Sequence, residues 1–183
     1  MARNMEKSQE DVRERIIAAS MKVFSKYGFF KAPVKLVAME AGVSKGLVFW
    51  YFRRKDELIV EVALRSLPAE VIEQCIKSGG KGKELLRCIG RKYLEKYRNE
   101  MYKNLLLHTL AAEAVYPRVR EEVRKICENY TREVALRVYG EDSPRTRTAI
   151  RAFFGGLLCY VLRPPMDIKG EEYVENLIKL IAP

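Results

Sequence analysis

The chain has 183 residues, of which 48% are hydrophobic and 32% are charged, and its formal net charge is +10. This balance is typical of a globular protein that buries a sizeable core, and it excludes a disordered chain. No run of 18 apolar residues occurs, so the sequence predicts no membrane span and no membrane partner. Without an apolar signal core at the N-terminus, we expect a cytoplasmic protein.

The positive charge is unevenly distributed along the chain. Residues 1–55 carry 12 Lys and Arg against 5 Asp and Glu, whereas residues 56–183 carry 22 against 19. A basic excess in the first third is what neutralisation of nucleic-acid phosphates needs. A surface that merely keeps the protein soluble explains the same charge equally well.

A first helix is predicted over residues 10–27, after a polar tail formed by residues 1–9. Apolar side chains recur at helical spacing along this segment, and Gly28 is expected to end the helix. The stripe consists of Val12, Ile16, Ala19, Val23, Phe24 and Tyr27.

Two short helices separated by a tight turn are predicted next. The first begins at Pro33, which suits a first helical position, and Gly42 just past its end can adopt the left-handed conformation that stops a helix. Ser44 can cap the second helix, whose inner face carries Val48 and Phe52. This pattern predicts a helix-turn-helix over residues 32–51, with a second helix able to enter the major groove.

The same region carries a family resemblance. Tyr27-Gly28-Phe29, Val37-Ala38, the run from Ala41 to Gly46, and the run from Lys55 to Leu58 occur in order and almost without gaps. In these motifs the first third of the chain resembles the TetR family of repressors. The resemblance implies an all-α fold with a three-helix DNA-binding domain, here residues 1–55, and a helical ligand-binding and dimerisation domain, residues 56–183.

The resemblance also implies a function, namely a homodimeric repressor that binds a palindromic operator and leaves it when a small-molecule inducer binds. From composition we expect this inducer to be hydrophobic. Ser44 and the N-terminus of its helix suit a phosphate, Lys45 suits a guanine edge, and Trp50 suits a thymine methyl. The predicted DNA-binding residues are Lys35, Ser44, Lys45, Gly46, Leu47, Phe49, Trp50, Tyr51 and Lys55.

Several positions depart from the family pattern. Ala32 and Pro33 replace a Thr/Ser pair that caps the first helix of the motif, and Arg54 replaces a Ser or Asn before Lys55. Leu47 replaces a small or hydroxylated residue, and Phe49 replaces a tyrosine whose hydroxyl contacts phosphate. These changes keep the fold and alter the side chains that would contact the operator.

The remaining two thirds read as helices throughout. The first starts near Asp56 and is kinked or restarted at Pro68, because a proline within a helix removes a hydrogen bond. Later helices are predicted over residues 84–99, 101–114, 119–139, 144–162 and 171–181.

The last two predicted helices suit a dimer interface. The apolar pattern around Gly155 and Gly156 allows a partner helix to approach closely, although burial within one monomer explains the same residues. The predicted interface comprises Phe153, Phe154, Gly155, Gly156, Leu157, Tyr160, Val174, Leu177 and Ile178.

A mostly apolar ligand pocket is predicted from the helices between residues 84 and 162. The candidate lining residues are Met101, Tyr102, Leu105, His108 and Phe153, each of which also suits plain core packing. His108 is the only histidine and has no partner of metal-ligand spacing, so no metal, cofactor or catalytic site is predicted. Two alternatives stay open: a constitutive or architectural DNA-binding protein without a ligand, and, far behind, a helical enzyme.

Four cysteines, Cys75, Cys88, Cys127 and Cys159, are widely spaced and form no C-x-x-C pair. Each lies in an apolar helical pattern, where a thiol behaves as a small hydrophobe. We therefore expect reduced, structural thiols in preference to metal ligands or redox sensors.

Overall fold

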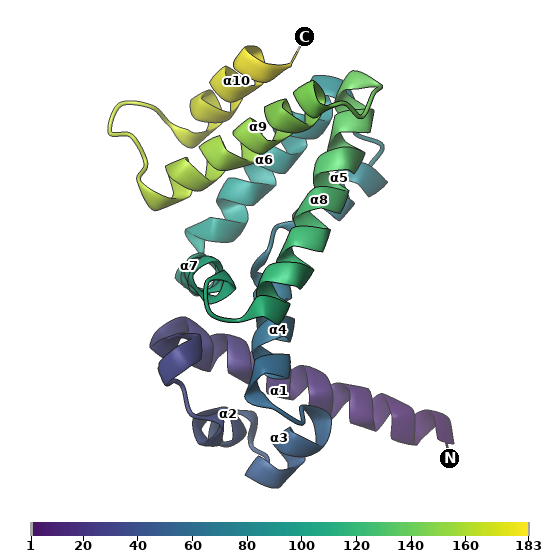
Figure 1. Ribbon diagram of the computed structural model, residues 1–183, viewed down its shortest axis with the longest axis vertical. Coiled ribbons are helices and arrows are strands. Elements are labelled where there is room, and N and C mark those ends of the chain that lie inside the picture. The colour runs from purple at the N-terminus through teal and green to yellow at the C-terminus, as the bar shows by residue number, and fades with distance from the viewer. Residues whose placement is uncertain (1, 183) are drawn as a thin grey trace. The chain divides into compact units, whose positions relative to one another are not determined.

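The computed structural model describes the backbone of residues 2–182 (Figure 1) and the side chains of residues 10–182. Within residues 2–182 it contains ten α-helices and no strand, so the predicted all-α fold is confirmed. The helices are α1 (Ala2–Lys31), α2 (Val34–Ala41), α3 (Lys45–Tyr51), α4 (Lys55–Ser66), α5 (Ala69–Lys77), α6 (Gly82–Arg98), α7 (Glu100–Glu113), α8 (Pro117–Tyr139), α9 (Pro144–Leu162) and α10 (Gly170–Ile181).

The helices pack into two compact units, which are described separately below. The first contains the chain up to Ser66 together with Met101–Val123. The second contains Leu67–Glu100 and the chain from Arg124 onward. The domain boundary between residues 55 and 56, expected from the resemblance, stays a prediction.

Helix α1 differs from its predicted bounds at both ends. It begins at Ala2, in the segment expected to be a tail, which has no proline or glycine to interrupt a helix. At its other end Gly28 has φ 74° and ψ 162°, and helical structure resumes after it up to Lys31. Gly28 therefore kinks the helix instead of ending it. A side chain there would be strained, and its Cβ would meet the His108 ring at 3.4 Å.

The core of the first unit forms where α1 packs against α2 and α4. Phe24 and Phe29 are fully buried and meet edge to face, with ring centroids 5.3 Å apart. The buried hydroxyls of Ser66 and Thr109 share a hydrogen bond of 2.9 Å, which joins α4 to α7 within this unit. This core holds the short helices α2 and α3, which are too short to be stable alone.

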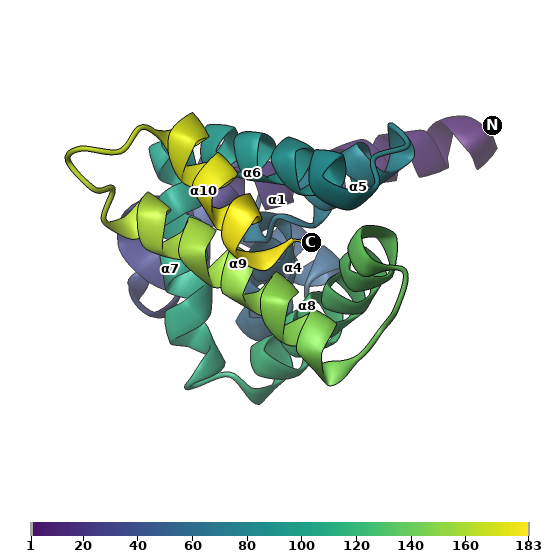
Figure 2. The ribbon, with the colours of Figure 1, turned by 90° about the horizontal axis from the view of Figure 1, so that it is seen from above.

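The second unit is built around α6, which packs against α5, α9 and α10. Figure 2 shows α10 lying alongside α9. Gly90 in α6 allows close packing, since a Cβ there would meet Val174 of α10 at 2.6 Å. The fully buried side chains of this unit include Leu85, Leu86, Ile89, Ile150 and Phe153.

The expectation of four reduced thiols is wrong for two of them. Cys75 in α5 and Cys88 in α6 form a disulfide, with their Cα atoms 5.8 Å apart. The turn between α5 and α6 brings these helices face to face, a pairing that residue spacing does not reveal. Cys127 and Cys159 take no part in a disulfide, and both are exposed instead of occupying an apolar core.

Candidate nucleic-acid interface

Helix α2 carries the predicted apolar stripe on its buried side. Val34, Val37, Ala38 and Ala41 are all buried. Pro33 has an extended conformation just before the helix, so α2 begins one residue later than predicted. Gly42 is left-handed, with φ 63° and ψ 37°, and the next N–H, from Val43, donates to the Ala38 carbonyl at 3.0 Å. The helix therefore ends at the predicted glycine.

Helix α3 is capped and anchored as the sequence predicts. The Ser44 hydroxyl oxygen accepts a 3.1 Å hydrogen bond from the Leu47 N–H. Val48, which is 1% exposed, is the one buried residue of this seven-residue helix. Phe52, directly after the end of α3, is also buried. The Arg13 guanidinium carbon lies over its ring, 5.3 Å from the ring centroid. Two apolar anchors thus set which side of α3 faces outward.

The outward side of α3 combines a cation with large apolar groups. Trp50 is 63% exposed, and Leu47 and Phe49 are also exposed. The Lys45 ammonium lies 5.7 Å from the Phe49 ring centroid, and Trp50 packs edge to face on Tyr51 with centroids 4.6 Å apart. Aromatic and apolar groups gathered on one exposed side of a helix stay in contact with water at a cost in free energy, so they indicate a binding surface.

The other two predicted lysines have different environments. Lys35 is exposed on α2. Lys55, at the start of α4, is partly buried, and its ammonium donates to the Phe30 carbonyl at 3.1 Å. Burial lowers the pKa of Lys55 below that of a free lysine. Lys55 therefore ties the start of α4 to the end of α1, which its position in the motif did not reveal.

The start of α4 has a cap that sequence reasoning missed. The Glu57 carboxylate accepts a 3.0 Å hydrogen bond from the Arg53 N–H, and Arg54 forms a 3.0 Å ion pair with Asp56. Arg54 thus replaces the usual capping residue without leaving this end of α4 uncapped. An acidic residue at the third position of a helix is the sequence signal for such a contact.

Two short helices joined by a left-handed glycine, the second capped by serine and exposing Lys45 and Trp50, form a helix-turn-helix. The family model described as "Bacterial regulatory proteins, tetR family" matches residues 16–62, which contain this motif. The chain belongs to the TetR family. The predicted family is confirmed.

Individual proteins similar to this chain are transcriptional regulators. The transcriptional regulator SrpR of Pseudomonas putida is 39% identical over 72 residues, which cover 39% of this chain and 34% of SrpR, so that match spans about a third of the relative. The regulator AcrR of Shigella flexneri is 25% identical over 98% of this chain and 94% of its own. A transcriptional regulator from Rhodococcus sp. Rha1 has the same fold, with a TM-score of 0.74 and 24% identity, over 92% of this chain and 95% of that one.

The motif and these relatives make this chain a DNA-binding transcriptional regulator of the TetR family. The relatives named here are regulators, and regulators of this kind are not enzymes. Within residues 10–182, no cluster of three His, Cys, Asp or Glu side chains is arranged to hold a metal ion. No helix between residues 2 and 182 has both the length and the apolar character needed to cross a membrane.

The predicted dimer residues fall into two groups within the second unit. Phe153, Leu157, Val174 and Ile178 are buried in the protomer itself, as the alternative of plain burial required. The others keep exposed surface, and Gly155 has no atom within 4 Å of the position of its absent Cβ. They are Phe154, Gly155, Gly156, Tyr160 and Leu177.

The predicted ligand residues do not gather at one place. Met101, Tyr102, Leu105 and His108 belong to the first unit, whereas Phe153 belongs to the second. Leu105 and Phe153 are fully buried, and the His108 ring lies 6.0 Å from the Phe29 ring. Neither cavity of the second unit that is described below is lined by any of them.

Proposed function

We propose that this TetR-family regulator is a homodimeric repressor that reads a palindromic operator with α3 and is released by a small-molecule ligand. The observation that carries the proposal is the outward face of α3. It presents a lysine and a tryptophan on a helix whose opposite side is held by Val48 and Phe52. A helix with this presentation is suited to the major groove.

Each exposed group of α3 has a role in DNA binding on this proposal. Lys45 donates to a guanine edge or a phosphate, and the apolar surfaces of Leu47 and Trp50 pack on thymine methyl groups. Ser44 already accepts a hydrogen bond from the Leu47 N–H, so its contribution to DNA binding is chiefly to hold the helix start in place. Gly46 adds no side chain there and lets the backbone come near the DNA.

Dimerisation is supported by apolar surface on the last two helices. Leu180 on α10 is 81% exposed, Leu162 on α9 is also exposed, and Gly155 leaves open space above α9. Small residues let two helices approach closely while neighbouring leucines supply buried area. A two-fold dimer would place its two reading helices in successive major grooves, roughly 34–36 Å apart.

A ligand response follows from this geometry, because a change in the separation of the reading helices weakens both half-site contacts together. The alternative is a constitutive DNA-binding protein without a ligand. A repressor must lose operator affinity when its ligand binds, whereas a constitutive protein keeps the same affinity with every compound tried.

The test is binding of the purified protein to DNA from its own upstream region at several salt concentrations. Trp50 is the only tryptophan, so its fluorescence reports directly on α3. We expect specific binding with a steep salt dependence, and a Lys45→Gln variant whose salt slope is smaller by about one.

The matched control is Lys81→Gln, which removes an exposed lysine outside the helix-turn-helix. It should leave both affinity and salt slope nearly unchanged. If Trp50 fluorescence stays constant at saturating DNA and both variants change the slope equally, α3 is not the reading helix and the proposal is wrong.

A further inference from the structure

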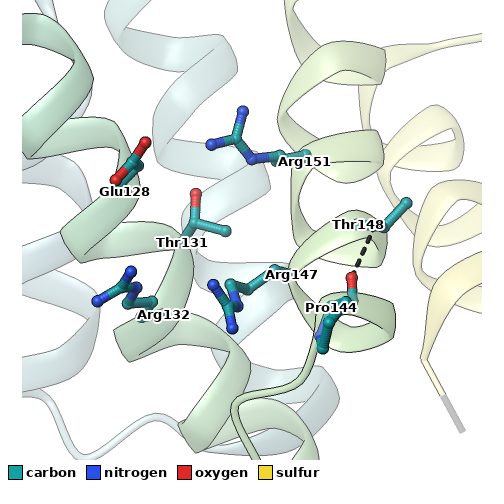
Figure 3. A pocket seen from close by; sticks show the side chains of 7 residues that line it. All are labelled: Glu128, Thr131, Arg132, Pro144, Arg147, Thr148 and Arg151. Carbon is teal, nitrogen blue, oxygen red and sulfur yellow. Dashed lines mark hydrogen bonds between the residues drawn. The ribbon is translucent and has the colours of Figure 1, made fainter.

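A polar cavity lies between α8 and α9 in the second unit (Figure 3). Its volume is about 300 Å³, which is enough for a small organic molecule. Three of its seven lining residues are arginines and one is a glutamate. The lining consists of Glu128, Thr131, Arg132, Pro144, Arg147, Thr148 and Arg151.

The positive charge of this lining is only partly neutralised by the protein, because among the described side chains Arg147 alone of the three arginines forms an ion pair, with Asp142. Arg132 and Arg151 form no ion pair with any residue in the range 10–182, and neither does Glu128. In Figure 3 the guanidinium groups of Arg147 and Arg151 point from α9 towards α8. Like charges that share a cavity repel one another, so an anion between them lowers the energy of the site.

Arg147 also lacks a hydrogen-bond partner for one of its buried nitrogen atoms. Its Nε lies 2.8 Å from a carboxylate oxygen of Asp142, yet this atom is buried and has no hydrogen bond of acceptable geometry. A buried donor without a good acceptor is costly. The contact with Asp142 orients the side chain, and the rest of the guanidinium has no described partner.

The two threonines of the lining do not compete for an anion. The Thr131 hydroxyl donates to the Cys127 carbonyl at 2.6 Å, and the Thr148 hydroxyl donates to the Pro144 carbonyl at 2.7 Å. The donors left in the cavity are therefore guanidinium N–H groups, which match the oxygens of carboxylates and phosphates. A ligand for this cavity must be rich in acceptors and negatively charged.

A second cavity in the same unit makes the contrast clear. It is lined by two arginines and two glutamates, so its formal charges cancel. Its remaining lining residues are Leu94, Gly170 and Val174. The charge excess is thus a property of the α8–α9 cavity and does not follow simply from the net charge of the chain.

We propose that the α8–α9 cavity binds a small organic anion through Arg132, Arg147 and Arg151, with the carboxylate or phosphate oxygens as the recognised group. The step from binding to operator release rests on the proposed function, whereas binding itself does not. On this inference the ligand of the regulator carries a charged head, unlike the purely hydrophobic inducer expected from composition.

The experiment is isothermal titration calorimetry of the DNA-free protein with inorganic phosphate and with benzoate, at constant ionic strength. Saturable binding at one site per chain is expected for at least one probe. Binding of phosphate alone identifies a phosphate site, and binding of benzoate alone identifies a carboxylate site. If neither probe binds with a Kd below about 10 mM, the cavity is not an anion site.

Substitutions in the cavity separate a site from general attraction to a basic protein. Arg132→Gln and Arg151→Gln should each weaken binding at least tenfold. Their matched controls are Arg124→Gln on α8 and Arg145→Gln on α9, which remove the same charge from exposed positions outside the cavity. Equal weakening by all four variants overturns the inference.

Glu128→Gln tests the same cavity with a variant that should raise the affinity for an anion instead of lowering it. Removing the one carboxylate of the lining should tighten anion binding several-fold, whereas Glu172→Gln, an exposed change on α10, should not. Operator binding is then measured with and without the bound probe. Calorimetric binding without operator release contradicts the proposed ligand response but leaves the anion site intact, so the two failures are distinguishable.

Discussion

The α2–α3 region and the α9–α10 region are both apolar helix pairs, yet their exposed surfaces have different origins. In α3 one residue, Val48, is buried, and nearly everything else faces outward. In α9 and α10 the apolar residues divide between a core that includes Phe153 and Val174 and an outer surface that includes Gly155. In a short helix the one or two buried residues decide which side chains face the solvent. In a long helix with many apolar residues, the sequence alone does not decide which of them are buried.

The largest expected effect tests the anchors of α3. Phe52→Ala removes a buried ring and should lower the free energy of unfolding by about 3–5 kcal/mol. Operator binding should be weakened with it, because α3 then keeps only one of its two apolar anchors, Val48. Denaturant unfolding followed by circular dichroism measures the stability change.

The matched control for this variant is Phe49→Ala, on the exposed side of the same helix. It should change stability by no more than about 0.5 kcal/mol and reduce operator affinity instead. Equal destabilisation by the two variants would contradict the assignment of inner and outer faces to α3.

The next effect concerns the unit that contains α9 and α10. The disulfide between Cys75 and Cys88 joins α5 to α6, and the two cysteines are 13 residues apart in the sequence. Helix α6 in turn packs directly against α9 and α10. Replacing both cysteines with serine should lower stability by about 3 kcal/mol, because the unfolded chain gains entropy. Thermal unfolding of the double variant measures this.

Cys127→Ser/Cys159→Ser is the control for that variant, since both of these residues are exposed. It should unfold close to the temperature of the parent protein. A parent protein that unfolds at the same temperature with and without a strong thiol reductant would show that the disulfide contributes no stability.

A smaller effect separates residues that contact the operator from residues that stabilise the first unit. Trp50→Ala should weaken operator binding by about 1–3 kcal/mol and leave stability unchanged within about 0.5 kcal/mol. Tyr27→Ala removes another exposed aromatic that lies outside α2 and α3. Fluorescence anisotropy with labelled operator should show little change for Tyr27→Ala; an equal loss for both would place the contact surface elsewhere.

The last expected effect concerns Gly155 on the exposed side of α9. Gly155→Ala and Gly155→Leu both replace an exposed helical glycine with a better helix former, so each should stabilise the protomer by up to about 1 kcal/mol. Association should respond differently, because alanine still permits a close helix approach and leucine does not. Analytical ultracentrifugation should show self-association weakened at least tenfold by leucine only; a dimer unaffected by both would exclude α9 at Gly155 from the interface.

Local sequence signals accounted for most of what was predicted correctly. The left-handed Gly42 and the Ser44 cap lie where the motif placed them, because each depends on backbone contacts within a few residues. The same local reasoning misjudged Gly28. A positive φ at glycine is compatible with a kink as well as with a helix end, and the structure shows helical residues after it.

The amino-acid sequence by itself determined the helical fold, the helix-turn-helix and the family, because helix periodicity and helix caps depend on residues close together in the chain. The tertiary structure decided which cysteines pair, which apolar residues of α9 and α10 are buried, and where three arginines line one cavity. Those features join residues on different helices. Periodicity shows that a helix has an apolar face, but only packing shows which other helix covers it.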